Sequence, residues 1–317
     1  MKILVTGGLG YVGGRLADRL ARRAGAAVTL TDLAPAAGLP EWAKGFAFLP
    51  ADVTDKSSLA AVFAADKFDA VVHLAALNDA QCAADPERAV AVNAGGTYNV
   101  LAAASAAGVT RAVYFSTFHV YGPGAGERIT EQTPARPAHP YGFTHRAAED
   151  YCAYFRAYRG MKTLVFRMSN SFGCPMDHGV NAWTLVFNDL CRQLQVHGFV
   201  TLKSSGEQHR DFITLSDATA AVEHFLFDRD DWGDGLYNLG GGGSISILEA
   251  ARRVEAVYER LYDRKPGPIK VGPAAPGASI RPVNYVIDKL KAAGFAPAGG
   301  VDAEIERTLR LCEVFRK

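Results

Sequence analysis

Cysteine is scarce in this sequence, and the few cysteines present are not grouped. The 317 residues include five of them, Cys82, Cys152, Cys174, Cys191 and Cys312, and no two form a CxxC pair. An odd number of dispersed cysteines argues against a disulfide framework and against a zinc knuckle, and it suits a reducing compartment. We therefore expect a cytoplasmic protein without a metal site, in which each cysteine is a small buried hydrophobe.

Long apolar runs and an excess of one charge are missing as well. No stretch approaches the length that spans a membrane, and the strand-like Lys2–Val5 shows no signal-peptide pattern. The formal net charge is +1, and no basic tract stands out. Neither nucleic acid nor an anionic membrane is therefore an expected partner. Hydrophobic residues make up 49% of the chain, which suits one large α/β unit or two small domains.

What the sequence does contain, at its start, is a glycine-rich turn between a strand and a helix. Lys2–Thr6 is typical of a buried strand, Gly7–Gly13 follows, and roughly Val12–Arg23 has helical apolar spacing. Ala27–Thr31 is typical of a second strand, and it leads into Asp32. A glycine pattern alone also fits an ordinary turn. With its strand, helix and acidic residue in place, it predicts a dinucleotide site.

The predicted roles within this turn follow from geometry. Gly7 permits the tight turn, Gly10 lets the backbone approach a pyrophosphate, and Gly13 lets helix and strand pack closely. The first helical residues, Tyr11 and Val12, carry unpaired N–H groups that face the phosphates. The Asp32 carboxylate accepts hydrogen bonds from ribose hydroxyls and repels a 2′-phosphate, which favours NAD over NADP.

Strands and helices continue to alternate along the chain, which predicts an α/β fold with a doubly wound parallel sheet, a Rossmann fold. The expected strands are Phe46–Pro50, Ala70–Leu74, Ala112–Ser116 and Leu164–Arg167, and the expected helices are Leu59–Ala65, Pro86–Ala107 and Tyr141–Tyr158. We assign residues 1–168 and roughly 210–240 to this domain, with Leu236–Gly240 returning to the sheet. Residues of roughly 169–209 and 241–317 form a smaller C-terminal lobe that binds substrate.

One helix brings a phenol and an imidazole together. Pro140 suits a first helical turn, and Gly160 suits a helix end. Between them Tyr141 and His145 leave the same face one turn apart. A phenol beside a second polar group can accept a proton from an alcohol if its pKa is lowered.

Several ordered motifs carry a resemblance to a known family. They are Thr6-Gly7-Gly8-x-Gly10-x-x-Gly13, Asp52-Val53, His73-Leu74-Ala75-Ala76, Asn93 in Val-Asn-x-x-Gly-Thr, Ser116-Thr117-x-x-Val120-Tyr121-Gly122, Pro140-Tyr141-Gly142, Arg167-x-x-Asn170, Arg210-Asp211-Phe212-Ile213 and Tyr237-Asn238-Leu239-Gly240. Over nearly its whole length the chain resembles the extended short-chain dehydrogenase/reductases, in the nucleotide-sugar epimerase and dehydratase group (UDP-glucose 4-epimerase-like).

The resemblance implies an NAD-dependent enzyme acting on a nucleotide sugar. For the cofactor it implies contacts from Gly7, Gly10, Gly13, Asp32, Asp52, Val53, Leu74, Ala75, Ala76, Asn93, Tyr141 and His145. For catalysis it implies that Tyr141 is the base and that Thr117 binds the reacting hydroxyl. For the substrate diphosphate it implies Asn170 and Arg210, helped by Asn181 and Arg281. By position, Phe118 and His119 are candidates for the sugar pocket.

His145 departs from the family pattern, which is Tyr-x-x-x-Lys. The lysine hydrogen-bonds the nicotinamide ribose and lowers the pKa of the tyrosine. A unit charge about 4 Å away at an effective dielectric near 20 is worth roughly 4 kcal/mol, or about three pKa units. Histidine keeps the hydrogen bond and loses most of the charge at neutral pH. Either His145 supports a Tyr141 base that works best at alkaline pH, or the protein is a redox-silent binder of NAD and a nucleotide sugar.

The residues after Thr117 narrow the reaction. Related 4,6-dehydratases place Asp-Glu there and decarboxylases a Glu at the second position, whereas this chain has Phe118-His119. We therefore expect redox chemistry at a sugar carbon, C4, most simply 4-epimerisation through a transient ketose. Nucleotide-sugar dehydrogenase and ketosugar reductase are alternatives that use the same residues. A reductase of substrates without a diphosphate is disfavoured by Asn170 and Arg210. For Arg210 alone, a surface salt bridge with Asp211 or Asp217 is the plainer alternative.

Two further expectations concern His119 and assembly. If Thr117–Tyr121 is extended, His119 shares a face with Thr117 and Tyr121 and is an extra acid, base or hydroxyl ligand. The plainer alternative is a loop histidine with satisfied hydrogen bonds. By analogy with relatives, a homodimer forms through helices at roughly Pro86–Ala107 and Tyr141–Tyr158.

Overall fold

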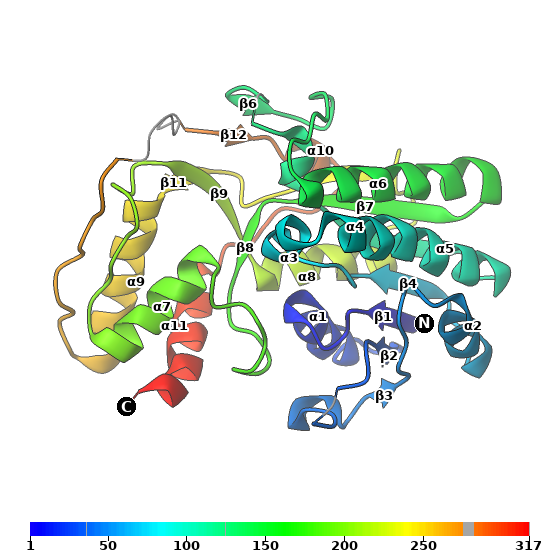
Figure 1. Ribbon diagram of the computed structural model, residues 1–317, viewed down its shortest axis with the longest axis horizontal. Helices are drawn as coiled ribbons and strands as arrows, with labels where there is room; N and C mark the ends of the chain where they lie inside the picture. Colours follow the sequence, from blue (N-terminus) through cyan, green and yellow to red (C-terminus); the bar gives the residue numbers. More distant parts are fainter. Residues whose placement is uncertain (36, 124, 275–281, 317) are drawn as a thin grey trace. The chain divides into compact units, whose positions relative to one another are not determined.

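The structure of the chain is a computed structural model that describes all residues except 36, 124, 275–281 and 317 (Figure 1). It divides into two compact units. One comprises Met1–Ala125, Glu131–Met168 and Thr219–Asn238, and the other Gly126–Thr130, Ser169–Ala218 and Leu239–Lys317. Residues 126–130, 210–218 and 239–240 thus group with the second unit, whereas the sequence-based division placed them with the first.

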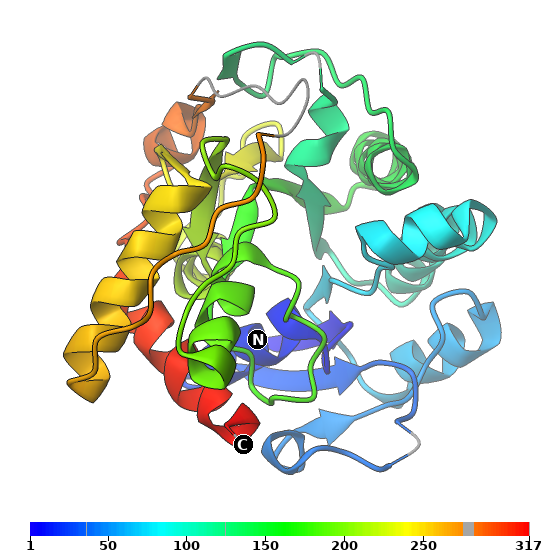
Figure 2. The ribbon, with the colours of Figure 1, turned by 60° about the vertical axis from the view of Figure 1, so that its left-hand side comes forward.

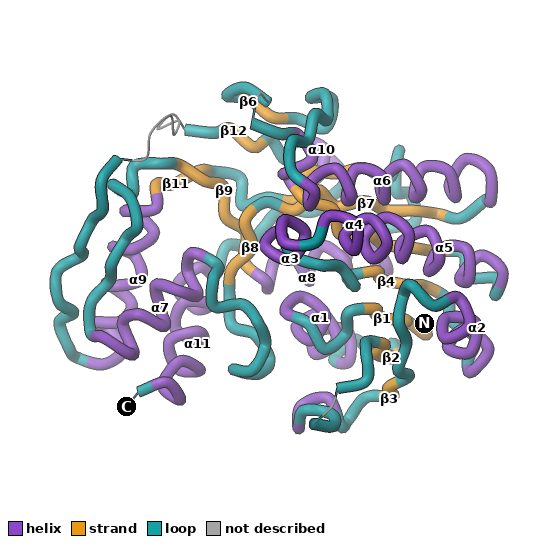
Figure 3. The backbone as a smooth tube through the Cα atoms, viewed as in Figure 1, coloured by secondary structure: helices purple, strands orange, loops and turns teal. Residues whose placement is uncertain are grey.

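A seven-stranded sheet forms the centre of the first unit, in the order β10-β7-β5-β4-β1-β2-β3. Figure 3 shows β7, β4, β1, β2 and β3 of this sheet in orange. The strands are β1 (Lys2–Thr6), β2 (Ala27–Thr31), β3 (Ala47–Phe48), β4 (Ala70–His73), β5 (Arg111–Thr117), β7 (Lys162–Met168) and β10 (Leu236–Leu239). Neighbouring strands from β3 to β7 pair in parallel. The predicted Rossmann-like α/β fold is confirmed. The expected strand at Phe46–Pro50 is shorter than predicted.

One face of this sheet is covered by α2 (Lys56–Ala65), α5 (Gly96–Ala106) and α6 (Pro140–Arg159), which lie side by side (Figure 1). Their apolar residues share a core with Leu4, Val71 and Val165 of the sheet. The other face carries α1 (Tyr11–Ala21), which lies beside α8 (Leu215–Glu223) through an ion pair between Arg19 and Glu223. These are the two helical layers of a doubly wound fold.

The expected helix over Pro86–Ala107 is interrupted. It consists of α4 (Pro86–Ala89), a π-helical segment η2 (Val90–Gly95) and α5, and it follows a short helix α3 (Asp79–Ala84) that we did not predict. Apolar spacing does not distinguish a wide π turn from continuous α-helix, and this segment holds the buried side chain of Asn93. π turns are frequent at functional sites.

The second unit has its own core. Its sheet has the order β11-β9-β8, with β8 (Asn170–Phe172), β9 (His209–Thr214) and β11 (Ser244–Ser246). A second pair joins β6 (Arg128–Ile129) to β12 (Asn284–Tyr285). Helices α7 (Val186–His197), α9 (Ile247–Tyr262) and α11 (Val301–Leu311) pack together, as Figure 2 shows. A short helix α10 (Asp288–Ala292) follows β12.

Helix α6 begins and ends where the sequence predicts. Pro140 is its first residue, and His139 before it accepts a hydrogen bond from the backbone N–H of Tyr141. The helix ends at Gly160, whose φ of 68° is the left-handed conformation that glycine adopts at low cost. The N-terminal end of α6 therefore presents Tyr141, one helical turn before His145.

A buried ion pair fastens α6 to the sheet. The Glu149 carboxylate accepts hydrogen bonds from Arg167 Nε at 2.9 Å, Arg167 Nη2 at 2.7 Å and Ser116 Oγ at 2.6 Å. Arg167 lies on β7 and Ser116 on β5, and all three side chains are buried. Arg146, which is partly exposed, adds a fourth hydrogen bond at 3.1 Å. One carboxylate thus ties the helix to two central strands.

We predict that Arg167→Met destabilises the protein by about 3–5 kcal/mol, because the Glu149 charge stays buried without its main partner. The free energy of unfolding in urea measures this effect. Arg146→Met is the matched control, and it should cost at most about 1 kcal/mol because its side chain reaches solvent. Equal losses in the two variants would contradict the dependence on burial.

Candidate active site

The glycine turn after β1 is closely packed on one side and open on the other. A Cβ on Gly13 would lie 2.2 Å from the carbonyl oxygen of Gly7, and one on Gly7, whose φ is +64°, 2.7 Å from the N of Ala75. A Cβ on Gly10 would meet only the Gly7 oxygen, at 3.1 Å. Packing within the chain thus requires glycine at positions 7 and 13. At Gly10, the missing side chain leaves space on the outer side of the turn.

Asp32 stabilises this turn from the end of β2. Its carboxylate accepts hydrogen bonds from the N–H of Leu9 at 3.1 Å and of Leu33 at 2.8 Å. Burial raises the pKa of Asp32, and both hydrogen bonds oppose that shift. Helix α1 starts at Tyr11 after Gly10, which has no side chain to cap it. The N–H groups of its first turn and a carboxylate beside them fit the diphosphate and ribose of a dinucleotide.

The residues after β3 and β4 differ in what they contact. Asp52 is exposed and accepts hydrogen bonds from Thr54, while Val53 is buried and packs where Gly96 has no side chain. The N–H groups of Leu74 and Ala75 donate to Thr6 Oγ1, at 3.1 and 3.3 Å. Ala76 and the Asp52 side chain therefore stay open to a ligand, whereas Val53 supports the fold.

Both side-chain amide atoms of Asn93 form hydrogen bonds within the protein. Its Oδ1 accepts a hydrogen bond from Leu77 N at 2.8 Å, and its Nδ2 donates to Leu77 O and, at 3.2 Å, to Thr144 Oγ1 on α6. The side chain is 1% exposed. Its placement beside α6 makes Asn93 a support for the loop after β4 rather than an open ligand-binding amide.

Tyr141 has three polar or aromatic neighbours. The Thr117 hydroxyl interacts with the phenol, the ring of Tyr141 lies 4.5 Å from the ring of His145, and the ring of His119 lies 5.8 Å away. Thr117 ends β5, so the strand and the helix bring together the two residues predicted to act on the same hydroxyl. Phe118 is partly buried and packs against His119, with ring centroids 4.1 Å apart.

The electrostatics of this group differ from those of a Tyr–Lys pair. The pKa of Tyr141 is raised to about 12, chiefly by burial and further by Asp79 and Cys82, although the hydrogen bond with Thr117 lowers it. Burial lowers the pKa of His145 to about 3, and His73 and His119 act in the same direction. His145 is therefore neutral at every physiological pH and does not supply the positive charge of a lysine.

The segment after Thr117 is not extended. Phe118–Tyr121 forms a 3-10 turn, η3, in which the N–H of His119 donates to Thr117 Oγ1 at 3.2 Å. The condition under which His119 would share a face with Thr117 and Tyr121 is therefore not met, because the Thr117 hydroxyl at the strand end caps a turn instead. His119 is nevertheless near Tyr141 and exposed to solvent.

The predicted diphosphate ligands belong to the second unit. Asn170 Nδ2 donates to the backbone oxygen of Asp211 at 2.9 Å, Arg210 is exposed with one hydrogen bond to His209 O, and Asn181 is exposed. Within the described residues, neither Asp211 nor Asp217 pairs with Arg210, since Asp211 binds loop N–H groups. Arg281 lies outside the described residues.

Tyr114 was not among the predicted site residues. Its hydroxyl lies 2.5 Å from Nδ1 of His145, and both side chains are 3% exposed. The alternation of side chains along β5 could have indicated it, because Tyr114 shares a face with Ser116, which binds Glu149 on α6, the helix that carries His145.

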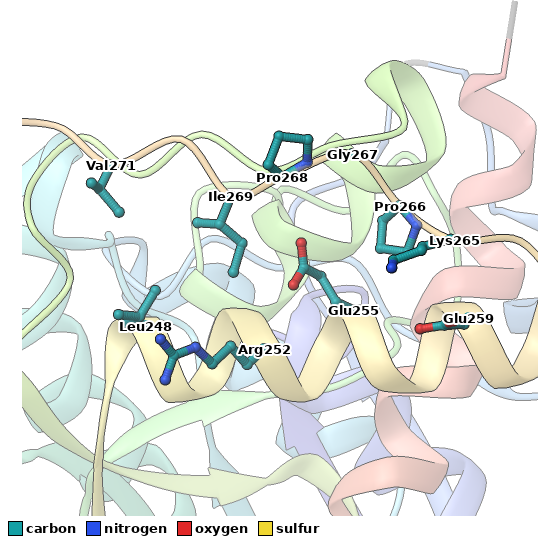
Figure 4. Close-up of a pocket in the computed structure, with 10 residues that line it drawn as sticks. All are labelled: Leu248, Arg252, Glu255, Glu259, Lys265, Pro266, Gly267, Pro268, Ile269 and Val271. Carbon is teal, nitrogen blue, oxygen red and sulfur yellow. The ribbon is translucent and has the colours of Figure 1, made fainter.

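Figure 4 shows a separate pocket beside α9, lined by charges of both signs, such as Arg252 and Glu255, and by no predicted site residue.

The described residues lack two further kinds of feature. They contain no group of three or more metal-ligating side chains, and no helix among them is long and apolar enough to span a membrane.

The geometry agrees with comparisons to known proteins. Residues 3–240 match the NAD dependent epimerase/dehydratase family. UDP-glucose 4-epimerase 2 of Oryza sativa is 30% identical over 301 residues, which cover 87% of this chain and 72% of that protein. dTDP-glucose 4,6-dehydratase of Neisseria meningitidis is 29% identical over 98% of this chain and 92% of its own length.

A solved structure has the same fold. UDP-glucose 4-epimerase of Thermus thermophilus, determined in complex with NAD, superposes with a TM-score of 0.80 and 27% identity, covering 98% of this chain and 99% of that one. The parallel sheet, the glycine turn and the Thr117–Tyr141 pair thus occur in a chain whose sequence and fold match one family over most of its length. The protein is an enzyme of the NAD-dependent epimerase/dehydratase family.

Proposed function

We propose that the protein interconverts the C4 epimers of a nucleotide sugar through a transient 4-ketose. The observation that carries this proposal is the placement of Thr117 beside Tyr141, with Phe118 and His119, neither of them a carboxylate, as the residues after Thr117. The 4-epimerases among the relatives support it. The dehydratase relative does not favour dehydration here, since the acid and base expected for that reaction are not present at Phe118 and His119.

In the proposed reaction, Tyr141 takes the proton of the sugar hydroxyl, and Thr117 orients that hydroxyl. Bound NAD supplies the hydride acceptor and donor, and its oxidised ring carries a positive charge. The same Tyr141 returns the proton when the ketose is reduced on its other face. Gly10, Asp32 and the first turn of α1 hold the cofactor, because a pyrophosphate suits open N–H groups. Asn170, Arg210 and Asn181 bind the substrate diphosphate, with Arg210 as a charged donor.

We also propose that the enzyme forms a homodimer through α5 and α6 and functions in the cytoplasm. Large hydrophobic side chains are exposed along these helices, including Tyr98, Tyr151 and Tyr154 at 37–38% and Tyr158 at 76%. The rings of Tyr98 and Tyr151 lie 5.2 Å apart, so the two helices share one aromatic surface. Exposed apolar patches of this kind mark protein interfaces.

The reaction is tested by NMR product analysis with a panel of UDP-, dTDP-, GDP- and CDP-sugars in the presence of NAD⁺. We expect a new C4 epimer without net NADH. Tyr141→Phe should lower kcat by about 10²–10⁴-fold, because the proton acceptor is lost. Tyr262→Phe, which removes a hydroxyl bound to Glu313, is the control and should keep its activity. A ketosugar with stoichiometric NADH would identify a dehydrogenase instead, and tight NAD binding without any product would favour a binding protein.

We predict that kcat rises with pH from about 6 to 9. A pKa of Tyr141 raised to about 12 means that the phenol is protonated at neutral pH, so a higher pH populates the base. His145→Lys should move the rising limb to lower pH, by at most about three pH units, because it adds a charge beside the phenol. A wild-type profile that stays flat down to pH 6 would contradict a Tyr141 base without a cationic partner.

The homodimer is tested by sedimentation equilibrium. The double substitution Tyr151→Glu and Tyr158→Glu should convert a dimer to a monomer, because it places negative charges from both protomers in a shared interface. The control Val314→Glu places the same charge at an exposed hydrophobic residue of the second unit, which is 56% exposed. It should leave the molecular mass of the assembly unchanged. A wild-type protein that is monomeric at micromolar concentration would refute the proposal.

A further inference from the structure

His145 has one ring nitrogen bound and one without a partner. Nδ1 lies 2.5 Å from the hydroxyl of Tyr114. Nε2 is buried and has no hydrogen-bond partner within the described part of the chain. A buried polar atom without a partner is costly, so a ligand is expected to bind it. Whether Nε2 donates or accepts depends on which nitrogen carries the hydrogen.

A hydrogen-bonded chain in the core determines where the neighbouring hydrogens lie. Thr6 Oγ1 accepts from two backbone N–H groups, so its own hydrogen goes to His73 Nδ1 at 2.6 Å. His73 therefore carries its hydrogen on Nε2, which donates to Thr97 Oγ1 at 3.0 Å. Thr97 in turn donates to Asn93 O at 2.5 Å. The hydrogen of Thr97 is thus already used.

Tyr114 is the next residue of this chain, because its hydroxyl contacts both Thr97 and His145. It has one hydrogen to give. A separation of 2.5 Å lies at the short limit of the range for O–H donors and below the range that N–H donors adopt. A phenol is also a stronger donor than a neutral imidazole. The hydroxyl of Tyr114 therefore donates to His145 Nδ1, and the hydrogen of His145 is on Nε2.

We propose that Tyr114 is a positioning residue that holds His145 as the Nε2–H tautomer, so that Nε2–H is a fixed donor for the nicotinamide ribose. The second half of this statement rests on the proposed function. A neutral histidine in this arrangement replaces the hydrogen-bonding half of the lysine's task and leaves out the charge. Tyr114 on β5 then allows His145 on α6 to take the place of the lysine, because it fixes the position of the imidazole hydrogen.

The tautomer is tested in the protein without ligand, by ¹⁵N NMR of imidazole-labelled protein at pH 7. We expect a pyridine-type shift for Nδ1 and a pyrrole-type shift for Nε2 of His145, assigned by their loss in His145→Gln. Tyr114→Phe should move the Nδ1 resonance, because the hydroxyl no longer donates to it. A pyrrole-type shift for Nδ1 of His145 in the wild type would overturn the proposal. So would an Nδ1 resonance that does not move in Tyr114→Phe.

Tyr121→Phe is the matched control for a purely structural effect. Tyr121 is as buried as Tyr114, and its hydroxyl donates to Asn238 Oδ1 at 2.5 Å. Its loss should destabilise the protein to a similar degree and leave the His145 resonances in place. If Tyr121→Phe moved those resonances equally, the effect of Tyr114→Phe would be general loosening of the core, and the proposal would fail.

The donor role is tested by NAD⁺ affinity in isothermal titration calorimetry. His145→Leu should weaken binding by about three- to tenfold, and His145→Gln, whose amide also donates, by less. Unchanged affinity in His145→Leu would refute the donor role. If NAD⁺ binds as predicted while no sugar is epimerised, the proposed function fails and the tautomer assignment stands, so the two outcomes are distinguishable.

Discussion

The position of helix α6 depends on one buried carboxylate. Glu149 receives hydrogen bonds from Arg167 on β7 and Ser116 on β5, so the middle of the helix is fixed against two central strands. Everything that the helix carries toward its N-terminus is oriented by that contact, including His145 and Tyr141. Because a buried charge without its partner is costly, the helix cannot slide or rotate without a large loss of stability. The catalytic geometry is thus set by electrostatics in the core, away from the reacting groups.

The parts of the molecule predicted from sequence are those in which local physics is sufficient. Lys2–Thr6 and Ala27–Thr31 are strands with the predicted bounds, since short apolar runs between turns are strands in an alternating fold. Pro140 and Gly160 bound α6 because each favours a backbone geometry found at helix ends. The pairing of Thr117 with Tyr141 followed from a recognised family pattern. It is a contact between distant segments that no local rule gives.

The features that could not be predicted from sequence depend on side-chain hydrogen bonds. The catalytic interpretation of His119 required an extended segment, but the Thr117 hydroxyl caps a 3-10 turn there. Tyr114 resembled any other apolar strand residue, and only the contact with His145 reveals its hydrogen bond. Asn93 resembled a cofactor ligand, yet its amide is occupied by the loop after β4 and by Thr144. For Tyr114 and Asn93 a side-chain hydrogen bond to a remote element decided the outcome, and for His119 a local one to Thr117 did so.

The π-helical turn at Val90–Gly95 has a consequence for comparing this chain with others. A π turn contains one more residue than an α turn, and each residue rotates a helix by about 100°. Residues on either side of Asn93 therefore face directions that ordinary helical counting would not assign to them. An alignment that places its gap elsewhere in this helix would match Asn93 or Thr97 with side chains that face another direction. Transferring residues between relatives in this region therefore requires superposed backbones and not sequence spacing alone.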